Sequence, residues 1–492
     1  CAGRCCLFNK KIKRKKPGED TESTGRLRTM LFTRKDFGDD FKWGVSTAAY
    51  QIEGAHNSDG KGPSIWDTFT KRRKKIFNDD NGDIACDHYR HYAEDIALIY
   101  KLNIPNHRFS ISWSRILPNG IGAVNHKGID FYNRVIDFCL ELGIEPWITL
   151  YHWDLPEALQ QKGGWANRDV IHWFSYFVDC CIRNFGDRVK YWMILNEPMV
   201  FTGAGYFLGV HAPGKKGLSS FLAAAHHAAL CQAEGGRIIK SMRSDSKVGT
   251  TFSYSHLEPY RYDDERDIKA TAKVDALLNR MFLEPLLGLG YPTADLKILE
   301  RIERFMFAHD EKKLAFDMDF IGLQNYTREF VSYAPLMPFV KARIIKASKR
   351  NVEHTLMDWE VYPPSIYNAL KRLHHYGTIN EIIVTENGAA FNDHYEENKV
   401  HDCKRVKFLQ DYIAQVLLAK REGVKVNGYF IWTLLDNFEW AEGYYPKFGI
   451  VHVDFKTQRR IIKTSGYWYS HFLKNTLAAS RETWDIAGIE MI

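Results

Sequence analysis

Two glutamates in this sequence stand where an acid–base reaction would need them. Glu197 lies near the end of the run VKYWMILNEP (189–198), and Glu386 lies near the end of the run IIVTENG (382–388). Both runs are apolar and β-rich, and each glutamate is followed by residues that stop a strand. Cleavage of a glycosidic bond requires two carboxyl groups, one to protonate the leaving oxygen and one to act at the anomeric carbon. The pair therefore predicts a site for glycoside hydrolysis.

The neighbours of the two glutamates suggest how the work is divided. One carboxyl must stay protonated near neutral pH and the other must stay ionised. Arg108 and Tyr326 are the candidates to keep Glu386 charged, the first by its own charge and the second by a hydrogen bond. Glu197 has the amide of Asn196 beside it rather than an obvious cation. We therefore expect Glu197 to be the acid, and expect alanine at either position to abolish turnover.

Polar or aromatic residues also stand at the ends of the other β-like runs. Single residues allow other interpretations: Gln51 could cap a helix, His152 could be a core histidine, Asn196 could hold a turn, and Arg108 could pair with any buried acid. Packing alone does not explain agreement at eight run ends, since strands buried on both faces should end in apolar residues. We predict one shared pocket, to which the runs contribute, in order, Gln51, Arg108, His152 and Trp153, Asn196 and Glu197, Tyr254, Tyr326, Glu386, and Trp432.

Alternating β-like and helix-like segments must position these residues. The amphipathic segments 130–142 and 170–185 are typical of the helices between the runs. No GxGxxG motif follows the first run, which argues against a nucleotide-binding sheet. We predict an α/β protein with a single (β/α)8 TIM barrel and long βα loops, built on eight strands at 41–46, 107–113, 145–153, 189–197, 247–255, 318–326, 381–386 and 426–432. We expect a flexible basic extension at 1–36, the barrel domain at 37–475 and a C-terminal tail at 476–492.

Charge is concentrated in two places. The net charge is +7, and basic runs occupy residues 10–16 and 72–75. Such runs could form a patch for nucleic acid or anionic lipid, but a solvated tail and a solvated loop are the simpler interpretation. No nucleic-acid motif is present, and no apolar stretch is long enough to span a membrane. We expect neither nucleic acid nor membrane as a partner.

The nine cysteines show no metal-binding spacing and no CxxC motif. Their odd number and their places inside apolar segments predict reduced thiols, hence a reducing compartment and a cytoplasmic location. Cys180 and Cys181 are interpreted as core residues of a helix. The chain begins with Cys1 rather than Met, so a preceding targeting segment and a lipid-modified Cys1 stay open.

Taken together, six stretches resemble the family-1 glycoside hydrolases, the retaining β-glucosidase and β-galactosidase group. The resemblance runs from residue 37 to residue 473 and is specific because every motif occurs in order along the barrel. The stretches are FKWGVSTAAYQIEG (41–54), RFSISWSR (108–115), YHWDLP (151–156), LNEP (195–198), VTENG (384–388) and WTLLDNFEW (432–440).

The resemblance implies roles for individual residues. Glu197 would be the general acid/base, and Glu386 would be the nucleophile that forms a glycosyl-enzyme intermediate. Arg108 and Tyr326 would orient and stabilise that nucleophile. Trp432 would be the platform under the sugar ring. The remaining substrate-binding residues would be Gln51, His152, Trp153, Asn196, Gln324, Glu439 and Trp440. The family's barrels need no metal and no organic cofactor.

Three details refine the resemblance. Glu439 would repel a phosphate, so a free sugar is favoured over a 6-phosphorylated one, and Glu197 in place of the Gln of plant thioglucosidases favours an O-glycoside. The sixth run reads GLQNYT (322–327) and departs from the family pattern, because Gln324 stands where the family has Asn. Asn325 begins a formal glycosylation sequon, but its place at a barrel strand end makes it a poor acceptor.

The predicted function is that of a retaining exo-β-glycosidase, foremost a β-glucosidase, with β-galactosyl or β-fucosyl residues as further substrates. Its partner would be a small β-glycoside or a short oligosaccharide. Two alternatives stay open: a relative that passes the glycosyl group to another acceptor, and a catalytically silent sugar-binding relative. The loops at 203–217 and 332–351 are expected to choose the aglycone. No sequence feature indicates an oligomeric state.

Overall fold

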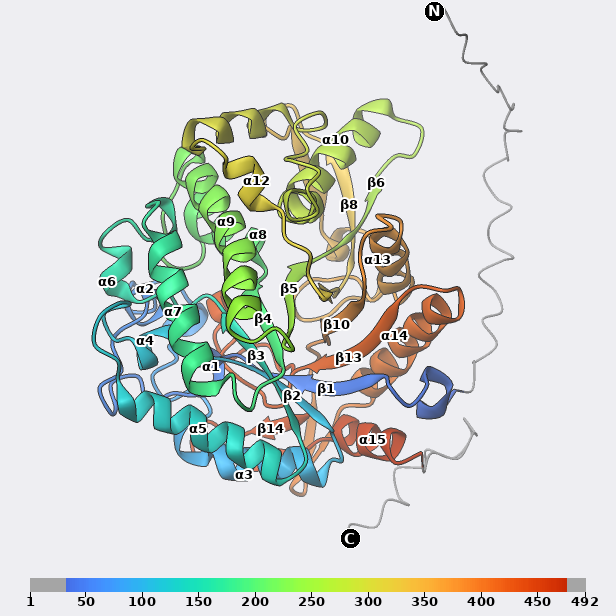
Figure 1. The fold of residues 1–492 in the computed structure, drawn as a ribbon. Helices are drawn as coiled ribbons and strands as arrows, with labels where there is room; N and C mark the ends of the chain where they lie inside the picture. The colour runs from blue at the N-terminus through green and yellow to red at the C-terminus, as the bar shows by residue number, and fades with distance from the viewer. Residues whose placement is uncertain (1–31, 476–492) are drawn as a thin grey trace, which may run out of the picture.

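The computed structural model describes residues 32–475, and its centre is a closed barrel of eight parallel strands (Figure 1). Around the barrel the strand order is β1-β13-β10-β7-β5-β4-β3-β2, so neighbours in space follow one another along the chain. The predicted (β/α)8 barrel is confirmed. Its strands are β1 Lys42–Ser46, β2 Asn106–Ser110, β3 Glu145–Tyr151, β4 Tyr191–Asn196, β5 Lys247–Ser253, β7 Phe320–Gln324, β10 Ile382–Asn387 and β13 Val426–Trp432.

Each strand contains most of one predicted run, and several end earlier than predicted. β2, for example, ends at Ser110, because the chain then turns into the short helix α4 (Trp113–Ile116). Tyr326, Trp153 and Tyr254 therefore follow their strands instead of closing them. The shorter strands leave these side chains in the loops at the carboxyl end of the barrel.

Large side chains fill the barrel interior. Trp147, Met193, Phe320, Ile383 and Phe430 come from five different strands and form a separate buried cluster. The ring of Trp147 is central, with centroids 5.0 Å from Phe430 and 5.6 Å from Phe320. Layers of side chains from several strands are what make a barrel of this kind a packed core. The apolar layer closes the barrel below the polar residues at the carboxyl end.

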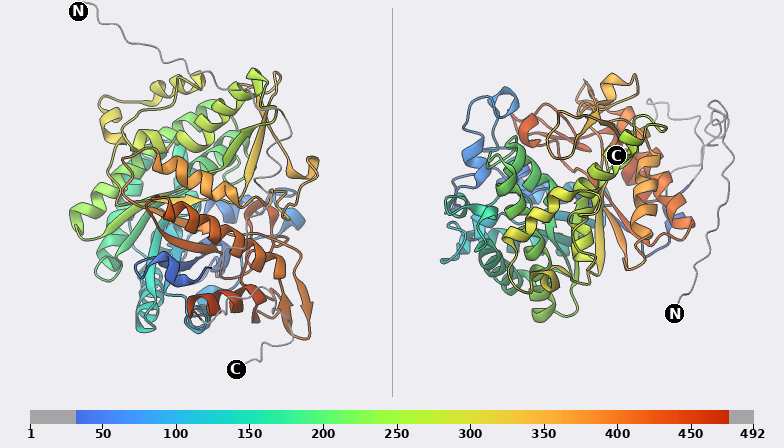
Figure 2. Two further views of the ribbon diagram at one scale, coloured as in Figure 1. Left: turned by 90° about the vertical axis from the view of Figure 1, so that its right-hand side faces the viewer. Right: turned by 90° about the horizontal axis from the view of Figure 1, so that it is seen from above.

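Helices enclose the barrel on the outside (Figure 2). In Figure 1, α5, α7 and α9 cover one flank, while α13 and α14 cover the other. The outer helices are α3 His88–Lys101, α5 His126–Glu141, α7 Val170–Phe185, α9 Leu218–Met242, α10 Glu265–Asp275, α11 Leu283–Leu286, α13 Pro364–His374, α14 Cys403–Arg421 and α15 Thr464–Leu473. Helix α7 has the predicted bounds, and α5 begins four residues before its predicted start.

The loops at the carboxyl end are long and carry their own structure. One small sheet, β6 His256–Pro259, β8 Arg328–Tyr333 and β9 Ala342–Ile345, lies with α10 at the upper right of Figure 1. Two hairpins add β11 His394–Glu396 with β12 Lys399–His401, and β14 Val451–Val453 with β15 Arg460–Ile462. The short helices are α1 Ala49–Ile52, α2 Ile65–Phe69, α4, α6 Glu157–Gln160, α8 Pro198–Thr202 and α12 Asp310–Leu314. Tight or wide helical turns are η1 Arg34–Phe37, η2 Phe77–Asp79, η3 Gly164–Ala166, η4 Gly203–Leu208, η5 Ala276–Arg280, η6 Lys297–Phe305, η7 Ala347–Lys349 and η8 Trp440–Glu442.

The predicted terminal segments fall largely outside the described residues. Residues 1–31 and 476–492, with the basic run at 10–16, are not described, and the predicted domain boundaries stay predictions. Residues 33–36 pack against the barrel domain, since Arg34 donates a 3.1 Å hydrogen bond to the carbonyl of Leu473. The other basic run lies in an exposed loop, where Arg72 bonds the carbonyl of Pro213. No helix within residues 32–475 is both long and apolar enough to cross a membrane.

The six cysteines of the described part are free thiols. Cys180 and Cys181 are buried in α7, as predicted for core residues, and Cys403 is exposed. The reducing compartment stays a prediction. The cytoplasmic location itself stays a prediction.

Candidate active site

The barrel strands end around a cavity of about 250 Å³ that contains both glutamates. Six further residues that the sequence proposed for the site line the same cavity: His152, Trp153, Tyr326, Trp432, Glu439 and Trp440. The remaining four are buried just behind this wall: Gln51 bonds Glu439, Arg108 bonds Glu386 and Asn196 bonds His152, whereas the side chain of Gln324 reaches the wall only through Asn196. These twelve residues thus belong to one connected group, and Tyr254, the other residue predicted for the pocket, does not line the cavity.

Glu386 lies in β10, where the pairing with β7 and β13 is irregular between Val384 and Asn387. Such bulges near active sites re-aim a side chain. Arg108 donates to Oε1 of Glu386 at 2.5 Å, and the Tyr326 hydroxyl donates to Oε2 at 2.6 Å. Burial raises the pKa of Glu386, while the charge of Arg108 and the hydrogen bonds from Tyr326 and Arg108 act in the opposite direction. These contacts favour the ionised carboxylate.

Glu197 follows β4 and precedes α8. Its φ of 45° lies in the left-handed region, which is uncommon for a residue with a side chain and is found at functional sites. Burial, followed by the charge of Glu386, raises the pKa of Glu197 well above its ordinary value. Within residues 32–475, no Lys, Arg or His forms an ion pair with Glu197. The environment therefore favours its protonated form, and its predicted role as the acid stays a prediction.

Asn196 connects the two halves of the site. Its Oδ1 accepts hydrogen bonds from Arg108 at 2.5 Å, from Gln324 at 2.7 Å and from Thr251 at 3.0 Å. Its Nδ2 lies 3.0 Å from Nε2 of His152. The three donors fix the orientation of the amide, so that Nδ2 faces the histidine. Gln324 thus keeps an amide donor in this network despite its departure from the family pattern.

A second polar group lies beside Trp440. Gln51 donates to Oε2 of Glu439 at 3.2 Å and to the carbonyl of Phe438 at 2.9 Å. Burial, followed by the charge of Glu386, raises the pKa of Glu439 to about 8, and the hydrogen bond from Gln51 lowers it. Oε1 of Gln51 is buried and has no hydrogen-bond partner within the described residues. The group can therefore offer both acceptors and donors to hydroxyls.

Aromatic rings enclose the remaining space. The ring centroids of Trp153 and Trp440 lie 4.5 Å apart, and His152 lies 5.9 Å from Trp432 at an interplanar angle of 27°. Flat apolar faces beside a few fixed polar groups are typical of small-molecule sites. Trp432 is almost completely buried, at 3% exposed, and it lines the cavity.

Comparison with known proteins identifies the family. The sequence model described as Glycosyl hydrolase family 1 matches residues 33–477, which is most of the chain. The chain belongs to glycosyl hydrolase family 1. Within this family, "1,4-beta-D-glucan glucohydrolase" of Thermotoga neapolitana is 46% identical over 443 residues, which cover 90% of this chain and 99% of the relative. "Beta-glucosidase 42" of Arabidopsis thaliana is 40% identical over 465 residues, covering 90% and 94%.

Solved structures of family 1 enzymes have the same fold. The family 1 β-glucosidase from Thermotoga maritima has a TM-score of 0.86 at 44% identity and covers 90% of this chain and 99% of its own. The same enzyme in complex with deoxynojirimycin gives a TM-score of 0.84 at 43% identity, with the same coverage of both chains. The predicted family is confirmed, and its enzyme class is that of glycoside hydrolases.

Sequence reasoning missed eight residues that line the cavity: Val200, His211, Ser253, Met357, Trp359, Ala441, Glu442 and Phe448. Ser253 is the last residue of β5, so the strand-end argument should have selected it instead of Tyr254, which does not line the cavity. His211 lies in the loop 203–217 that was expected to choose the aglycone. Val200 lies in the short helix α8, and Ala441 and Glu442 lie in the turn η8. Met357, Trp359 and Phe448 come from loops with no periodic pattern, and no local signal marks them.

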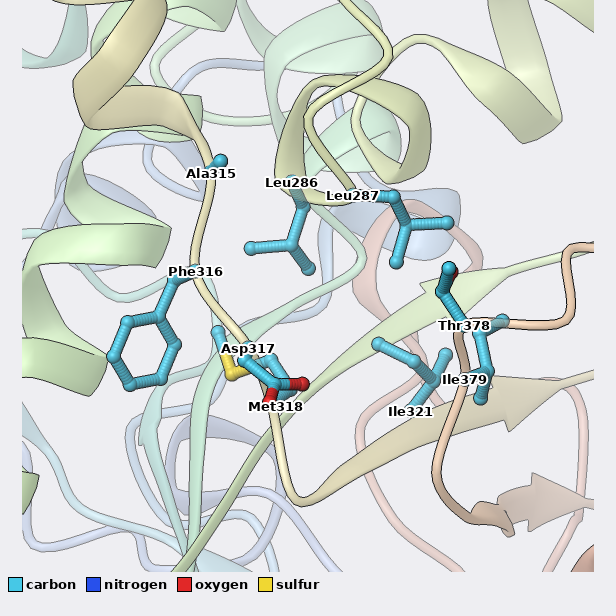
Figure 3. Close-up of a pocket in the computed structure, with 9 residues that line it drawn as sticks. All are labelled: Leu286, Leu287, Ala315, Phe316, Asp317, Met318, Ile321, Thr378 and Ile379. Carbon is cyan, nitrogen blue, oxygen red and sulfur yellow. The ribbon is translucent and has the colours of Figure 1, made fainter.

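A second cavity, of about 270 Å³, lies at the opposite end of β7 (Figure 3). Its wall is mostly aliphatic, with Leu286, Leu287, Met318, Ile321 and Ile379 around it, and Asp317 is its one carboxylate. One carboxyl group cannot supply the paired acid and nucleophile of a glycosidase. Within residues 32–475, no group of three or more His, Cys, Asp or Glu could hold a metal ion.

Proposed function

We propose that this chain is a retaining β-glucosidase that releases terminal β-D-glucosyl residues from small glycosides or short oligosaccharides. One observation carries the proposal: Glu386 is bound by Arg108 and Tyr326, whereas Glu197, in the same cavity, has no cation bound to it within the described residues. The difference supports an ionised nucleophile and a protonated acid. Family 1 membership and relatives named as β-glucosidases support the sugar.

In the first step, Glu386 would attack the anomeric carbon while Glu197 protonates the leaving oxygen. A covalent glycosyl-enzyme ester forms, and the aglycone departs as an alcohol. In the second step, Glu197, now ionised, would take a proton from water as the water attacks the same carbon. The ester bond to Glu386 breaks, and Glu197 regains its proton. Two inversions leave the β configuration unchanged. The required carboxyl separation of about 5–5.5 Å stays a prediction.

The polar groups around the cavity are arranged to hold an unphosphorylated sugar. Glu439 and Gln51 would accept from and donate to neighbouring hydroxyls, and Trp432 would lie under the ring. No Lys or Arg is among the described residues that line this cavity, so it offers no side-chain cation of that kind to a phosphate, which supports a free sugar. The amide of Asn196 and the ring of His152 would bind hydroxyls on the opposite side of the sugar.

The two alternatives are less well supported. A silent sugar-binding relative would not need both glutamates in one cavity with different environments, so the structure favours an enzyme. Transfer of the glycosyl group to an acceptor other than water would use the same intermediate, and no described contact favours it. We therefore propose hydrolysis as the principal reaction.

The test is chemical rescue of two alanine variants. We expect Glu386→Ala and Glu197→Ala each to lose activity on an activated aryl β-glucoside by several orders of magnitude. Azide should restore turnover in both. The product of Glu386→Ala should be the α-glucosyl azide, because azide replaces the nucleophile directly. The product of Glu197→Ala should be the β-glucosyl azide, because azide attacks the intermediate.

A matched control removes a carboxylate far from this chemistry. Glu396 is exposed in β11, and Glu396→Ala should retain wild-type activity and show no effect of azide. Near-full turnover of either active-site variant, or the same anomer from both, would contradict the assignment. A panel of aryl β-glucoside, β-galactoside and β-fucoside then ranks the sugars, with the glucoside expected to give the highest kcat/KM.

A further inference from the structure

Two residues of the cavity wall, Tyr326 and Trp359, are connected by contacts that lie outside the cavity. Tyr326, which bonds Glu386, and Trp359 come from different segments after β7, and their ring centroids lie 5.0 Å apart. A contact between two rings does not by itself fix the position of either side chain. Arg328, two residues after Tyr326, and Glu360, directly after Trp359, form an ion pair that joins the two segments. With Arg350 they make a largely buried ion cluster.

Glu360, the neighbour of Trp359, is at the centre of the cluster and is only 4% exposed. Arg328, two residues after Tyr326, donates to Oε2 at 3.0 Å and to Oε1 at 2.6 Å. Arg350 donates to Oε2 at 2.8 Å. The backbone repeats the connection, because the Thr327 hydroxyl donates to the carbonyl of Glu360 at 3.2 Å. A bidentate arginine–carboxylate pair fixes orientation as well as distance.

The cluster is anchored on its far side as well. Arg328 also donates to Oε1 of Glu258 in β6 at 3.3 Å, and its guanidinium lies 3.5 Å from the ring centroid of Tyr362. Nε2 of His256 lies 3.0 Å from the same carboxylate oxygen. Burial acts to raise the pKa of Glu360, but the two arginines hold that pKa below its ordinary value. Arg328 therefore has a single well-defined position, set by three separate groups.

We propose that Glu360 is a positioning residue, which, through Arg328 and Arg350, holds Tyr326 against the nucleophile Glu386 and Trp359 in the cavity wall. The inference rests on the proposed function, since it matters for catalysis only if Glu386 is the nucleophile. Neither Glu360 nor the arginines line the cavity. Their effect on the reaction passes through Tyr326, whose hydroxyl must stay within 2.6 Å of Glu386.

A double-mutant cycle tests this coupling. Glu360→Gln keeps the side-chain size but removes the charge that binds both arginines. Misplacement of a catalytic contact by about 1 Å can cost on the order of 10²-fold in rate, so we expect kcat/KM to fall between about ten- and a hundred-fold. Tyr326→Phe removes the hydroxyl itself. In the double variant the loss should match the more severe single variant within about threefold, because the effects of coupled residues do not add.

The pH profile supplies a readout that general loss of stability would not change. Glu360→Gln should move the acidic limb of kcat/KM upward, in the same direction as Tyr326→Phe, because the nucleophile loses the same hydrogen bond. Asp95→Asn is the matched control. Asp95 is a buried carboxylate bound by Arg460 and His88 and does not line the cavity. The fold-loss of kcat/KM caused by Asp95→Asn should multiply with that caused by Tyr326→Phe. The acidic limb of the kcat/KM profile of Asp95→Asn should stay at the wild-type pH.

The proposal would be overturned if the losses of kcat/KM in Glu360→Gln and Tyr326→Phe multiply in the double variant. It would also be overturned if the acidic limb of kcat/KM stays in place in Glu360→Gln. If Glu360→Gln fails to fold by circular dichroism, Arg328→Lys replaces it in the cycle, since it keeps the positive charge but loses the bidentate pair with Glu360. The two levels of the argument are separable. If Tyr326→Phe leaves the acidic limb of kcat/KM in place, the proposed role of Glu386 is wrong. If Tyr326→Phe shifts the limb and Glu360→Gln does not, only the positioning role of Glu360 is wrong.

Discussion

Replacing Tyr326 by phenylalanine tests the electrostatics of the site most directly. The change removes one oxygen atom, the donor of the 2.6 Å hydrogen bond to Oε2 of Glu386. Hydrogen bonds to charged groups contribute about 1.5–3 kcal/mol, and one pKa unit corresponds to about 1.36 kcal/mol. Loss of the bond should therefore raise the apparent pKa of Glu386, the proposed nucleophile, by about one to two units.

The sign of the effect follows from which form the hydroxyl stabilises. Tyr326 donates to the ionised carboxylate, so it lowers the pKa of Glu386, and its removal raises that pKa. Glu386 then becomes protonated at a higher pH, and, if it is the nucleophile as proposed, the acidic limb of kcat/KM moves to higher pH. At the pH optimum, kcat/KM should fall by about tenfold or more, since about 1.4 kcal/mol of lost stabilisation costs a factor of ten.

The assay is the pH dependence of kcat/KM on 2,4-dinitrophenyl β-glucoside. This leaving group departs without protonation, so its acidic limb reports Glu386 with little contribution from Glu197. Tyr254→Phe is the matched control, because Tyr254 is also a buried tyrosine after a barrel strand, but its hydroxyl has no hydrogen-bond partner within the described residues. An acidic limb that stays in place in Tyr326→Phe, or that moves equally in Tyr254→Phe, would refute the reasoning.

Three further predictions concern other parts of the molecule. Glu439→Gln should lower kcat/KM on the β-glucoside by about tenfold or more. The pKa of Glu439 in the folded protein, about 8, lies above its value of about 4.3 in the unfolded chain, so this residue's contribution to stability is lost as pH rises from about 4.3 to 8. Glu439→Gln lacks this titration, so its melting temperature should rise relative to that of the wild type over the same pH range. A constant difference between the two melting temperatures would contradict the raised pKa. Gln324→Asn shortens the donor that bonds Asn196 at 2.7 Å and should lower kcat/KM by about two- to tenfold; an unchanged value would show that the bond is dispensable. Cys403→Ser should remove one thiol that reacts rapidly with Ellman's reagent under native conditions. If the variant and the parent protein have the same number of rapidly reacting thiols, the exposure of Cys403 is contradicted.

Much of the barrel and the chemistry at its centre could be predicted from local sequence. The run 426–432 is apolar and β-rich and forms β13 with those bounds. The segment 170–185 has apolar residues at helical spacing and forms α7. Because the carboxyl ends of barrel strands converge, a polar residue at such an end is placed near the others without any knowledge of contacts. That argument correctly brought Glu197 and Glu386 into one cavity.

The loops could not be predicted in the same way. Trp359 and Phe448 line the cavity, yet neither stands at a strand end or in a periodic segment. The left-handed backbone of Glu197 was also not visible, since φ > 0 is expected at Gly or Asn and not at Glu. Irregular segments take their shape from contacts with distant parts of the chain, and the ion cluster of Glu360 with Arg328 and Arg350 is one example.

The sequence by itself determined the eight-stranded barrel and placed both glutamates at its carboxyl end, because hydrophobic periodicity and residue type are local properties. Only the tertiary structure decided the pKa shifts of these side chains and the residues that they contact. Arg108 and Glu386 are 278 residues apart and meet at 2.5 Å, and Glu197 acquires its raised pKa from burial and from a charge 189 residues away. Electrostatic effects depend on distance in space and on exclusion of water, and the closed barrel sets both.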